Sequence, residues 1–260
     1  ARNKYSGDAY LILNPDVIAK KDQIEELAKE LDTFGSLALV APVLRNGDGS
    51  VQHSFTVRTF PTMGSTLAEL FFLHRLHPNN PWTKRYLCKD DPFLRDYLEG
   101  HKTDGIGPRE NLNRPLIVDQ PAGACILIRS SDFPGFANEY WPAWFEDVDL
   151  CKQLRARNRL VAICRHISVF HVGGYTRQVI TSSTFNNAWY PNMKLFWLKH
   201  GSSIEKLLLT LLLPMALLVR SIVFGIVALC AKIKGNDASY LDHLTTAKGL
   251  LRLAFNGVRR

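Results

Sequence analysis

Three carboxylates lie close together in the middle of the chain: Glu146, Asp147 and Asp149. They follow an aromatic, apolar run that starts at Trp141, and they open a segment that predicts a helix over about residues 146–157. A carboxylate at the edge of an apolar wall is well placed to act as a general base. Three acids so close together also repel one another, which a cation or a substrate hydroxyl would balance. The structural alternative stays open, because the helix dipole stabilises acidic residues in a first turn by roughly 0.3–1 kcal/mol.

A further acidic residue, Asp16, follows a strand-like run over residues 10–13. Ligands of open α/β sheets bind beyond the carboxyl ends of the strands, so Asp16 is placed to hold Mg²⁺ or Mn²⁺ against a diphosphate. The alternative is that Asn14 and Asp16 only form a turn, with Asp16 capping a helix from about residue 17 to 31. Together with the carboxylates near residue 147, Asp16 indicates a site that holds a metal-diphosphate and deprotonates a hydroxyl.

Two other segments add polar or small residues at strand ends. His171 ends a strand-like run, and neutral imidazole is a common metal ligand, although a lone histidine often serves only as a structural hydrogen-bonding group. The segment Gln120-Pro-Ala-Gly-Ala124 places small residues ahead of a strand. A substrate can approach the backbone closely at such residues, and a tight turn is an equal alternative.

Strand and helix patterns alternate along the first 170 residues or so. Strands are expected over residues 10–13, 36–44, 51–60, 115–119, 123–129, 160–164 and 167–171, and helices over 17–31, 64–75 and 146–157. Residues 77–114, which are rich in Pro, Asn, Asp and Gly, are expected to be the least structured part. The alternation favours an α/β sheet over a helical bundle or a β-sandwich.

Composition restricts the class of partner and the compartment. The chain has 260 residues and a formal net charge of +8, which favours anionic partners. Its basic residues form no Lys/Arg run and no nucleic-acid-binding motif is present, so a membrane surface ranks above nucleic acid. The five cysteines are an odd number without a C-x-x-C pair, which argues against a disulfide framework and indicates a reducing compartment.

The segment after Gly201 differs in composition from the rest. Residues 207–229 are almost wholly apolar, and Pro214, Arg220 and Gly225 interrupt them, so a clean transmembrane helix is not expected. Helices lying in the membrane interface fit this pattern best, and four basic residues are then expected at headgroup depth beside anionic lipid: Lys206, Arg220, Lys232 and Lys234. A spanning helix and a helix buried against the core or a partner remain alternatives.

Taken together, four segments resemble the family 2 glycosyltransferases, and within them the bacterial rhamnosyltransferases of cell-wall and O-antigen assembly. The segments are Leu11–Val17, Gln120–Ala124 with Ile128 and Arg129, Trp144–Cys151, and His171–Gly174. Their order and spacing match over residues 5 to about 200. The resemblance implies an α/β, GT-A-like (Rossmann-type) mixed sheet flanked by helices, with a C-terminal apolar helical appendage. It divides the chain into a catalytic core over residues 1–200 and a membrane-associated segment over 201–260.

The resemblance also implies an activity: inverting transfer of a rhamnose-like sugar from a nucleotide-diphosphate donor. The acceptor would be a lipid-linked (polyprenyl) glycan or a polysaccharide of the cell envelope, at the cytoplasmic face of the bacterial inner membrane. Mg²⁺ or Mn²⁺ is the expected cofactor, and nucleic acid is not an expected partner. The roles implied are general base for Asp147, metal ligands for Asp16 and His171, donor contacts for Asn14, Gly123 and Ala124, and acceptor contacts for Trp144, Glu146 and Asp149.

The chain departs from the family pattern in three places. The motif Asn14-Pro15-Asp16 has one carboxylate where many relatives carry two, and the segment Gly135–Glu139 lacks the usual aspartate. Relatives also carry a further N-terminal part, with a first strand and an aspartate that reads the nucleotide base, so the core is expected to be N-terminally incomplete. The alternative function is therefore a truncated, catalytically inactive glycosyltransferase remnant that acts at most as a membrane-bound binding module.

Overall fold

The computed structural model describes residues 7–99, 114–173 and 181–257. The chain folds into two compact units. The first comprises Ala1–Pro61, Pro81–Phe136 and Asp147–Tyr175, and the second Thr62–Asn80, Ala137–Glu146 and Thr176–Arg260. Residues 201–260 thus share a unit with earlier segments of the chain. The functional boundary at residue 200 stays a prediction.

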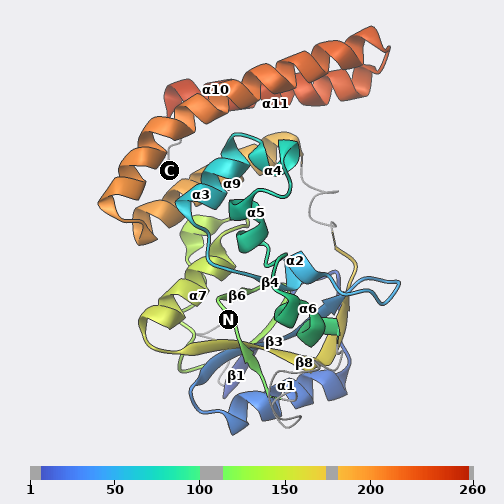
Figure 1. Ribbon diagram of the computed structural model, residues 1–260, viewed down its shortest axis with the longest axis vertical. Helices are drawn as coiled ribbons and strands as arrows, with labels where there is room; N and C mark the ends of the chain where they lie inside the picture. Colours follow the sequence, from blue (N-terminus) through green and yellow to red (C-terminus); the bar gives the residue numbers. More distant parts are fainter. Residues whose placement is uncertain (1–6, 100–113, 174–180, 258–260) are drawn as a thin grey trace. The chain divides into compact units, whose positions relative to one another are not determined.

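A mixed six-stranded sheet organises the first unit, with the order β1-β7-β3-β8-β2 and with β5 pairing to β8 (Figure 1). Its strands are β1 (Ala9–Leu13), β2 (Val17–Ile18), β3 (Leu37–Arg45), β5 (Leu116–Ile117), β7 (Cys125–Arg129) and β8 (Leu160–His171). β3 and β8 run parallel, and the other pairs are antiparallel. A second, two-stranded sheet joins β4 (Val57–Arg58) to β6 (Gln120–Pro121).

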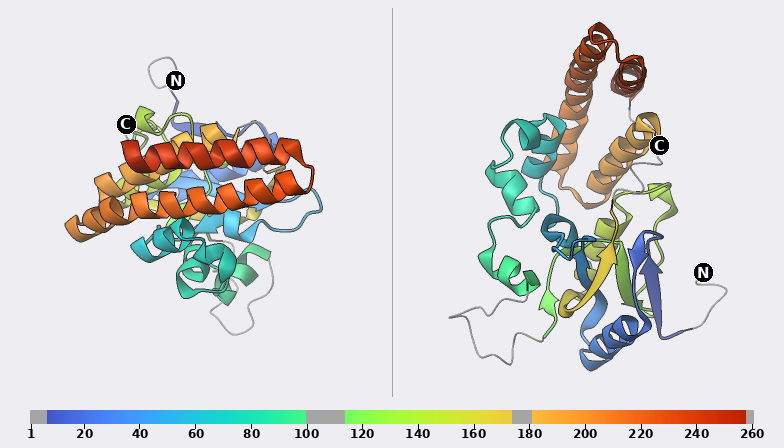
Figure 2. Two further views of the ribbon diagram at one scale, coloured as in Figure 1. Left: turned by 90° about the horizontal axis from the view of Figure 1, so that it is seen from above. Right: turned by 90° about the vertical axis from the view of Figure 1, so that its right-hand side faces the viewer.

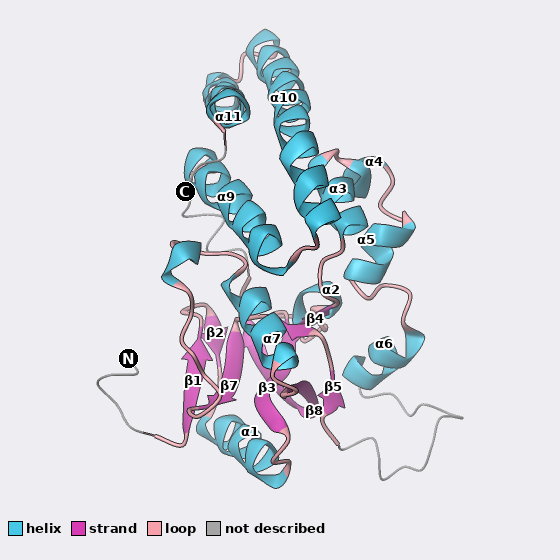
Figure 3. Ribbon diagram, turned by 90° about the vertical axis from the view of Figure 1, so that its left-hand side faces the viewer, coloured by secondary structure: helices cyan, strands magenta, loops and turns pink. Residues whose placement is uncertain are grey.

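Helices cover both faces of this sheet because its central strand is apolar on both sides. β3 is buried from Leu37 to Leu44, as expected of a strand between two layers. On one face it packs with Leu27 and Leu31 of α1 (Lys21–Thr33). On the other it packs with α6 (Pro92–Glu99) and α7 (Glu146–Ala156). Figure 3 shows α1 and α7 against the sheet. The predicted fold class is therefore confirmed: α/β, a mixed sheet flanked by helices, consistent with a GT-A-like fold.

Two elements near the candidate site differ from the sequence prediction. The helix expected from residue 17 begins only at Lys21, and Lys20 rather than Asp16 is its N-cap. Val17 and Ile18 instead form β2, because they pair with the end of β8. The strand expected over 51–60 is also wrong: α2 (His53–Thr56) and β4 occupy these residues. The backbone N–H groups of Phe55 and Thr56 bond to the Gln52 carbonyl, which turns the chain into a helix.

Other differences concern length. The long segment after residue 77 contains α5 (Pro81–Tyr86) and α6, while residues 100–113 lie outside the described part. The two strands expected over 160–171 are one strand, β8. Its register against β3 is irregular, because Pro42 lies opposite Cys164 and the next residue, Val43, lies opposite Ser168. The bulge therefore takes up Arg165, His166 and Ile167, and it fixes which face the last residues of β8 present.

The described part of the second unit is helical. It contains α3 (Met63–Leu70), α4 (Leu73–Leu76), the 3₁₀ helix η2 (Asn138–Tyr140), α9 (Ser182–His200), α10 (Ser203–Ile233) and α11 (Asp237–Asn256). α10 and α11 lie side by side, as the left-hand view of Figure 2 shows. Pro214, Arg220 and Gly225 do not interrupt the apolar segment, since all three lie inside α10.

α10 is long and apolar enough to cross a membrane, judged by length and composition alone. Its most apolar window has a mean hydropathy of 2.3, and 28% of that window is buried against the rest of the chain. Length and composition do not decide whether α10 spans a membrane, so the expectation against a clean transmembrane helix stays a prediction. The predicted C-terminal apolar helix itself is confirmed.

Candidate active site

The edge strand β2 brings Asp16 next to His171. Val17 lies opposite His171, and the Val172 N–H donates to the Asp16 carbonyl at 2.9 Å. This pairing places Asp16 Oδ2 3.5 Å from His171 Nε2, with the two side chains 9% and 4% exposed. The two residues lie 155 positions apart in sequence, and they converge as the sequence predicted. Their assignment as metal ligands stays a prediction.

Gln52 fixes the tautomer of the histidine ring. Its side-chain N–H group donates to the His171 carbonyl at 2.8 Å and to Asn46 Oδ1 at 2.7 Å. The amide oxygen of Gln52 therefore faces His171 Nδ1, at 2.8 Å, and can only accept. We assign the ring proton to Nδ1, which leaves the lone pair of Nε2 facing Asp16.

Burial keeps this ring neutral. It lowers the pKa of His171 below its ordinary value of 6.5, and the nearby Asp16 carboxylate raises it by less. Phe55 contributes to the burial, since its ring stacks on the imidazole at 5.0 Å between centroids. An unprotonated nitrogen and a carboxylate oxygen thus face one another, and both are acceptors. That arrangement suits a cation between them.

Asp16 and His171 offer two donors, so a divalent ion held between them would complete its shell with substrate oxygens. Among the described residues there is no group of three or more His, Cys, Asp or Glu side chains able to hold a metal ion. Mg²⁺ commonly binds one or two carboxylates together with substrate phosphates and water, and it needs no all-protein cage. Asp16 would supply one such carboxylate, and His171 would add a nitrogen, a donor that softer divalent ions prefer.

Asp147 lies at the start of α7 and faces the segment before β7. Its Oδ2 accepts from the Gly123 N–H at 3.2 Å, and its Oδ1 accepts from the Val148 N–H at 2.7 Å. A Cβ atom at Gly123 would stand 3.0 Å from Asp147 Cβ, so only glycine allows this approach without a shift. An ionised carboxylate has about four lone-pair positions, so two bonds leave room for a substrate hydroxyl.

Backbone pairing connects this aspartate to the Asp16 segment. The Asn14 N–H donates to the Ala124 carbonyl at 2.8 Å, directly after Leu13 pairs with Cys125. Gly123 and Ala124 therefore run from the Asp147 carboxylate to the strand end that precedes Asp16. All of these residues belong to the first unit. The predicted donor residues therefore connect the segment of the predicted base, Asp147, to the segment of the predicted metal ligand Asp16.

The three residues predicted to contact the acceptor differ in their burial and in the unit to which they belong. Asp149 is 1% exposed and accepts from Gln153 at 2.8 Å, which is a structural role, so contact with an acceptor has least support here. Glu146 is half-buried at the start of α7. Trp144 belongs to the second unit, where its ring lies edge-on to Phe185 at 4.8 Å. Their acceptor roles stay predictions, and Gly174 of the resembling segments lies outside the described residues.

Sequence reasoning missed Gln52 and Phe55. Both contact His171 from a position 116 to 119 residues earlier in the chain, in a segment predicted as a strand. Glutamine and phenylalanine there form no motif with a chemical signature. Only the three-dimensional course of α2 shows that they surround the imidazole.

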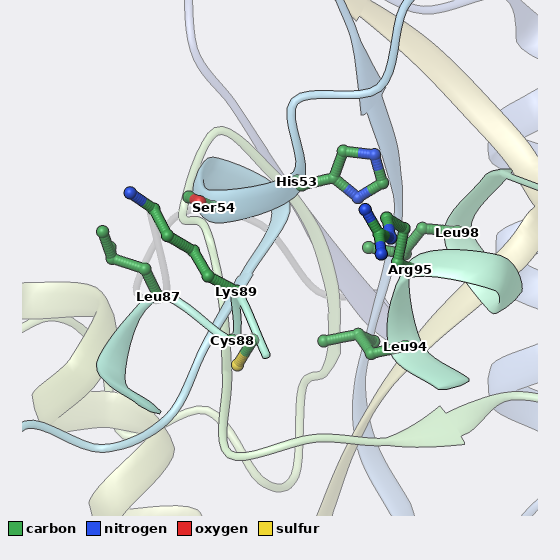
Figure 4. A pocket seen from close by; sticks show the side chains of 8 residues that line it. All are labelled: His53, Ser54, Leu87, Cys88, Lys89, Leu94, Arg95 and Leu98. Carbon is green, nitrogen blue, oxygen red and sulfur yellow. The ribbon is translucent and has the colours of Figure 1, made fainter. Parts of the chain in front are cut away.

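A cavity of about 190 Å³ is lined in part by residues of α2 (Figure 4). Its walls are His53, Ser54, Leu87, Cys88, Lys89, Leu94, Arg95 and Leu98. Sites for ligands of drug size usually measure ~300–1,000 Å³, so a nucleotide sugar does not fit here. Burial raises the pKa of the Cys88 thiol to about 11, which keeps it protonated, and His53 pairs with Glu99 at 2.6 Å.

Comparison with known proteins adds independent information. No protein-family model matches the chain. The chain is similar to the rhamnosyltransferase WbbL of Escherichia coli (strain K12), with 27% identity over 154 residues, 56% of this chain and 46% of that protein. It is also similar to the N-acetylglucosaminyl-diphospho-decaprenol L-rhamnosyltransferase of Mycobacterium tuberculosis, with 28% identity over 169 residues, 63% of this chain and 47% of that protein. The chain spans about half the length of these curated relatives. The similarity to two rhamnosyltransferases points to a glycosyltransferase.

Proposed function

We propose that the chain is the catalytic part of an inverting glycosyltransferase of the GT-A, family 2 type. It would move a rhamnose-like sugar from a nucleotide-diphosphate donor to a lipid-linked or polysaccharide acceptor in cell-envelope glycan synthesis. The observation that carries the proposal is the pairing of Asp16 with His171, together with the contact of Asp147 with Gly123, whose neighbour Ala124 bonds to the Asp16 segment. The similarity to two rhamnosyltransferases supports the same reading.

The donor side of the site rests on Asp16 and His171. In this proposal the two side chains would hold Mg²⁺ or Mn²⁺ against the donor diphosphate, and the ion would supply positive charge to offset that of the leaving group. Gln52 keeps the Nε2 lone pair of His171 available by holding the proton on Nδ1. The small residues Gly123 and Ala124 allow the sugar to approach the backbone.

The acceptor side rests on Asp147. The acceptor hydroxyl gives its proton to an Asp147 carboxylate oxygen as its own oxygen forms a bond to the anomeric carbon. The bond from that carbon to the diphosphate oxygen breaks on the opposite face, so the configuration inverts. The backbone N–H groups of Gly123 and Val148 hold the carboxylate in place for this step. A positioned general base of this kind contributes about 10²- to 10⁴-fold in rate.

The acceptor class follows from the relatives and from α10. The mycobacterial relative is named for an acceptor carried on decaprenol diphosphate. A polyprenyl-linked acceptor stays at a membrane, and the long apolar α10 would keep the enzyme at the same surface. We therefore include a membrane surface among the partners and assign the enzyme to the cytoplasmic face of the bacterial inner membrane.

The test is sugar transfer in purified membranes that contain the protein at its natural full length. Several nucleotide-sugar donors are supplied with Mg²⁺ or Mn²⁺, and donor binding is measured in parallel. Asp147→Asn is expected to lower transfer by about 10²-fold or more while donor affinity stays near that of the wild type. The matched control is Asp22→Asn, an exposed aspartate in the first turn of α1, which is expected to leave both unchanged.

Two results would count against this assignment. Full turnover in Asp147→Asn would remove the base from the mechanism. Donor binding by the wild type without transfer to any acceptor would favour the alternative function, a membrane-bound binding module without catalysis.

A further inference from the structure

α10 presents a continuous apolar stripe to the outside of the second unit. Exposed aliphatic residues recur every three or four positions from Ile204 through Met215 and Ile222 to Ile233. That spacing keeps them on one side of an α-helix. No charged residue interrupts the stripe, although Lys206, Arg220 and Lys232 lie elsewhere on the same helix. The stripe therefore runs the full length of α10.

The opposite face of α10 is packed inside the second unit. Leu209, Leu213 and Leu217 are buried there, and Ser221 Oγ donates to the Ala247 carbonyl of α11 at 2.8 Å. These contacts fix the rotation of α10 about its axis. The helix is therefore packed against the protein along one side and exposed along the other.

Arg220 is the strongest of these anchors. Its Nη1 donates to the carbonyls of Glu69 and Leu70, at the C-terminal end of α3, at 2.7 and 2.9 Å. Its guanidinium also lies 4.2 Å from the centre of the Phe72 ring. The carbonyls at a helix C-terminus carry partial negative charge, so they suit a buried cation. The Nη1 group of Arg220 is thereby bound within the protein, near the middle of α10, so Arg220 does not lie at headgroup depth.

This anchor divides α10 into two parts that are each too short to cross a bilayer. At 1.5 Å per residue, the part before Arg220 (203–219) measures about 26 Å and the part after it (221–233) about 20 Å, against a hydrocarbon core of ~30 Å. A spanning arrangement would require Arg220 to leave its partners and enter lipid, which is costly for a charged side chain. An arrangement along the membrane surface leaves all its contacts intact.

The neighbouring helix supplies charge that complements an anionic membrane. Lys248 and Arg252 lie on the same side of α11 as the exposed Leu241 and Phe255. Cations next to apolar side chains are typical of helices that lie in the interface of anionic bilayers. This combination favours a lipid surface as the occupant of the stripe over a second copy of the chain.

We propose that α10 lies in the plane of an anionic membrane surface, with its apolar stripe immersed along its whole length and Arg220 holding its other face to the protein. This goes beyond the membrane association included in the proposed function, because it excludes a transmembrane α10. It does not depend on catalysis.

Flotation of the full-length protein with phosphatidylglycerol-containing vesicles tests the surface, without donor or acceptor. The double variant Ile222→Glu/Ile226→Glu is expected to lower the vesicle-bound fraction about tenfold, because two charges would replace apolar side chains that the proposal immerses in the lipid. Thr210→Glu adds a charge at an exposed position off the stripe and is expected to float like the wild type. Circular dichroism confirms that each variant is folded. Equal flotation of the double variant would overturn the proposal.

Depth measurements test the orientation. Spin labels are attached in turn at Ile204, Met215, Ile226 and Ile233 in a Cys230→Ser background, which removes the exposed cysteine. An in-plane helix places all four labels at similar depth. A depth that is greatest in the middle and falls toward both ends would mean that α10 spans the bilayer, and it would overturn the proposal.

Sedimentation without lipid tests the competing occupant. A wild-type dimer that Ile222→Glu/Ile226→Glu dissociates, together with no vesicle binding, would show that a second copy covers the stripe instead. Sugar transfer with no vesicle binding would overturn this inference and leave the proposed function standing. Vesicle binding with no sugar transfer would overturn the proposed function and leave this inference standing.

Discussion

His171 of the first unit and Arg220 of the second are both nearly buried basic residues, and their surroundings differ in one respect. The Nη1 group of Arg220 donates to two backbone carbonyls, and its guanidinium lies over an aromatic ring. One ring nitrogen of His171 is bound by Gln52, while the other faces Asp16 with its lone pair unused. A buried base whose charged group is held by backbone carbonyls stabilises a fold. A buried base that faces another acceptor is arranged for a ligand.

The largest effect expected from this comparison is on the first unit. Asp16→Asn removes the carboxylate that faces His171 and should weaken metal-dependent donor binding by about 100-fold. Calorimetric titration of the donor with and without Mn²⁺ measures the effect. Donor affinity without metal should be the same in the variant and the wild type. An unchanged metal-dependent affinity would leave Asp16 with no ligand role.

The next largest effect is expected from Arg220→Met, and it should be an effect on stability alone. The variant leaves the carbonyls of Glu69 and Leu70 without their donor, which should lower the free energy of unfolding by about 2 kcal/mol. Four of the five tryptophans belong to the second unit, so urea unfolding followed by tryptophan fluorescence reports on it. Lys232→Met, an exposed cation in the same helix, is the control and should change stability little. A loss of donor affinity in Arg220→Met would contradict the contrast drawn here.

Gln52→Leu should have a moderate effect on metal-dependent donor affinity, about tenfold. Leucine removes the acceptor for Nδ1, so the ring no longer holds its Nε2 lone pair toward Asp16. Gln52→Glu keeps an acceptor at that place and should restore most of the affinity. A purely structural role would instead lower the stability of Gln52→Leu without separating the two variants in metal binding.

The smallest effect is the pH dependence of stability contributed by His171. Burial lowers its pKa in the folded state below the ordinary 6.5, so the unfolded chain binds the proton more readily. This contribution to stability is complete above the unfolded pKa and is lost as the pH falls below it. The stability of wild type should therefore decrease more than that of His171→Gln between neutral pH and about pH 5. Parallel curves for the two proteins would show that the ring is not held neutral by the fold.

Much of the sheet was predictable from the sequence because its strands are short apolar runs bounded by turn residues. Tyr10–Leu13, Leu37–Leu44 and Cys125–Arg129 all form strands where periodicity expected them. Residues 51–60 were not predictable in this way, since their apolar pattern fits a strand while local backbone hydrogen bonds to Gln52 form a helix. The apolar pattern and local backbone hydrogen bonding compete there, and the hydrogen bonding decides.

The candidate site was predictable only in part. The pairing of Asp16 with His171 followed from resemblance to a family, because nothing in the local sequence connects residues 155 positions apart. The local reading of Asp16 as a helix cap was wrong, since Lys20 caps α1. Gln52 carried no signal at all, because an amide that orients a histidine needs no neighbours of a particular type.

The end of β8, after its bulge, limits which insertions and deletions the gene for this chain tolerates. Side chains alternate along a strand, so losing one codon between Ser168 and Phe170 would turn the imidazole at the end of β8 to the other face of the sheet, away from Asp16. A lineage that lost such a codon would keep its strand and lose the pairing of His171 with Asp16. We therefore expect inherited insertions and deletions to spare these three positions.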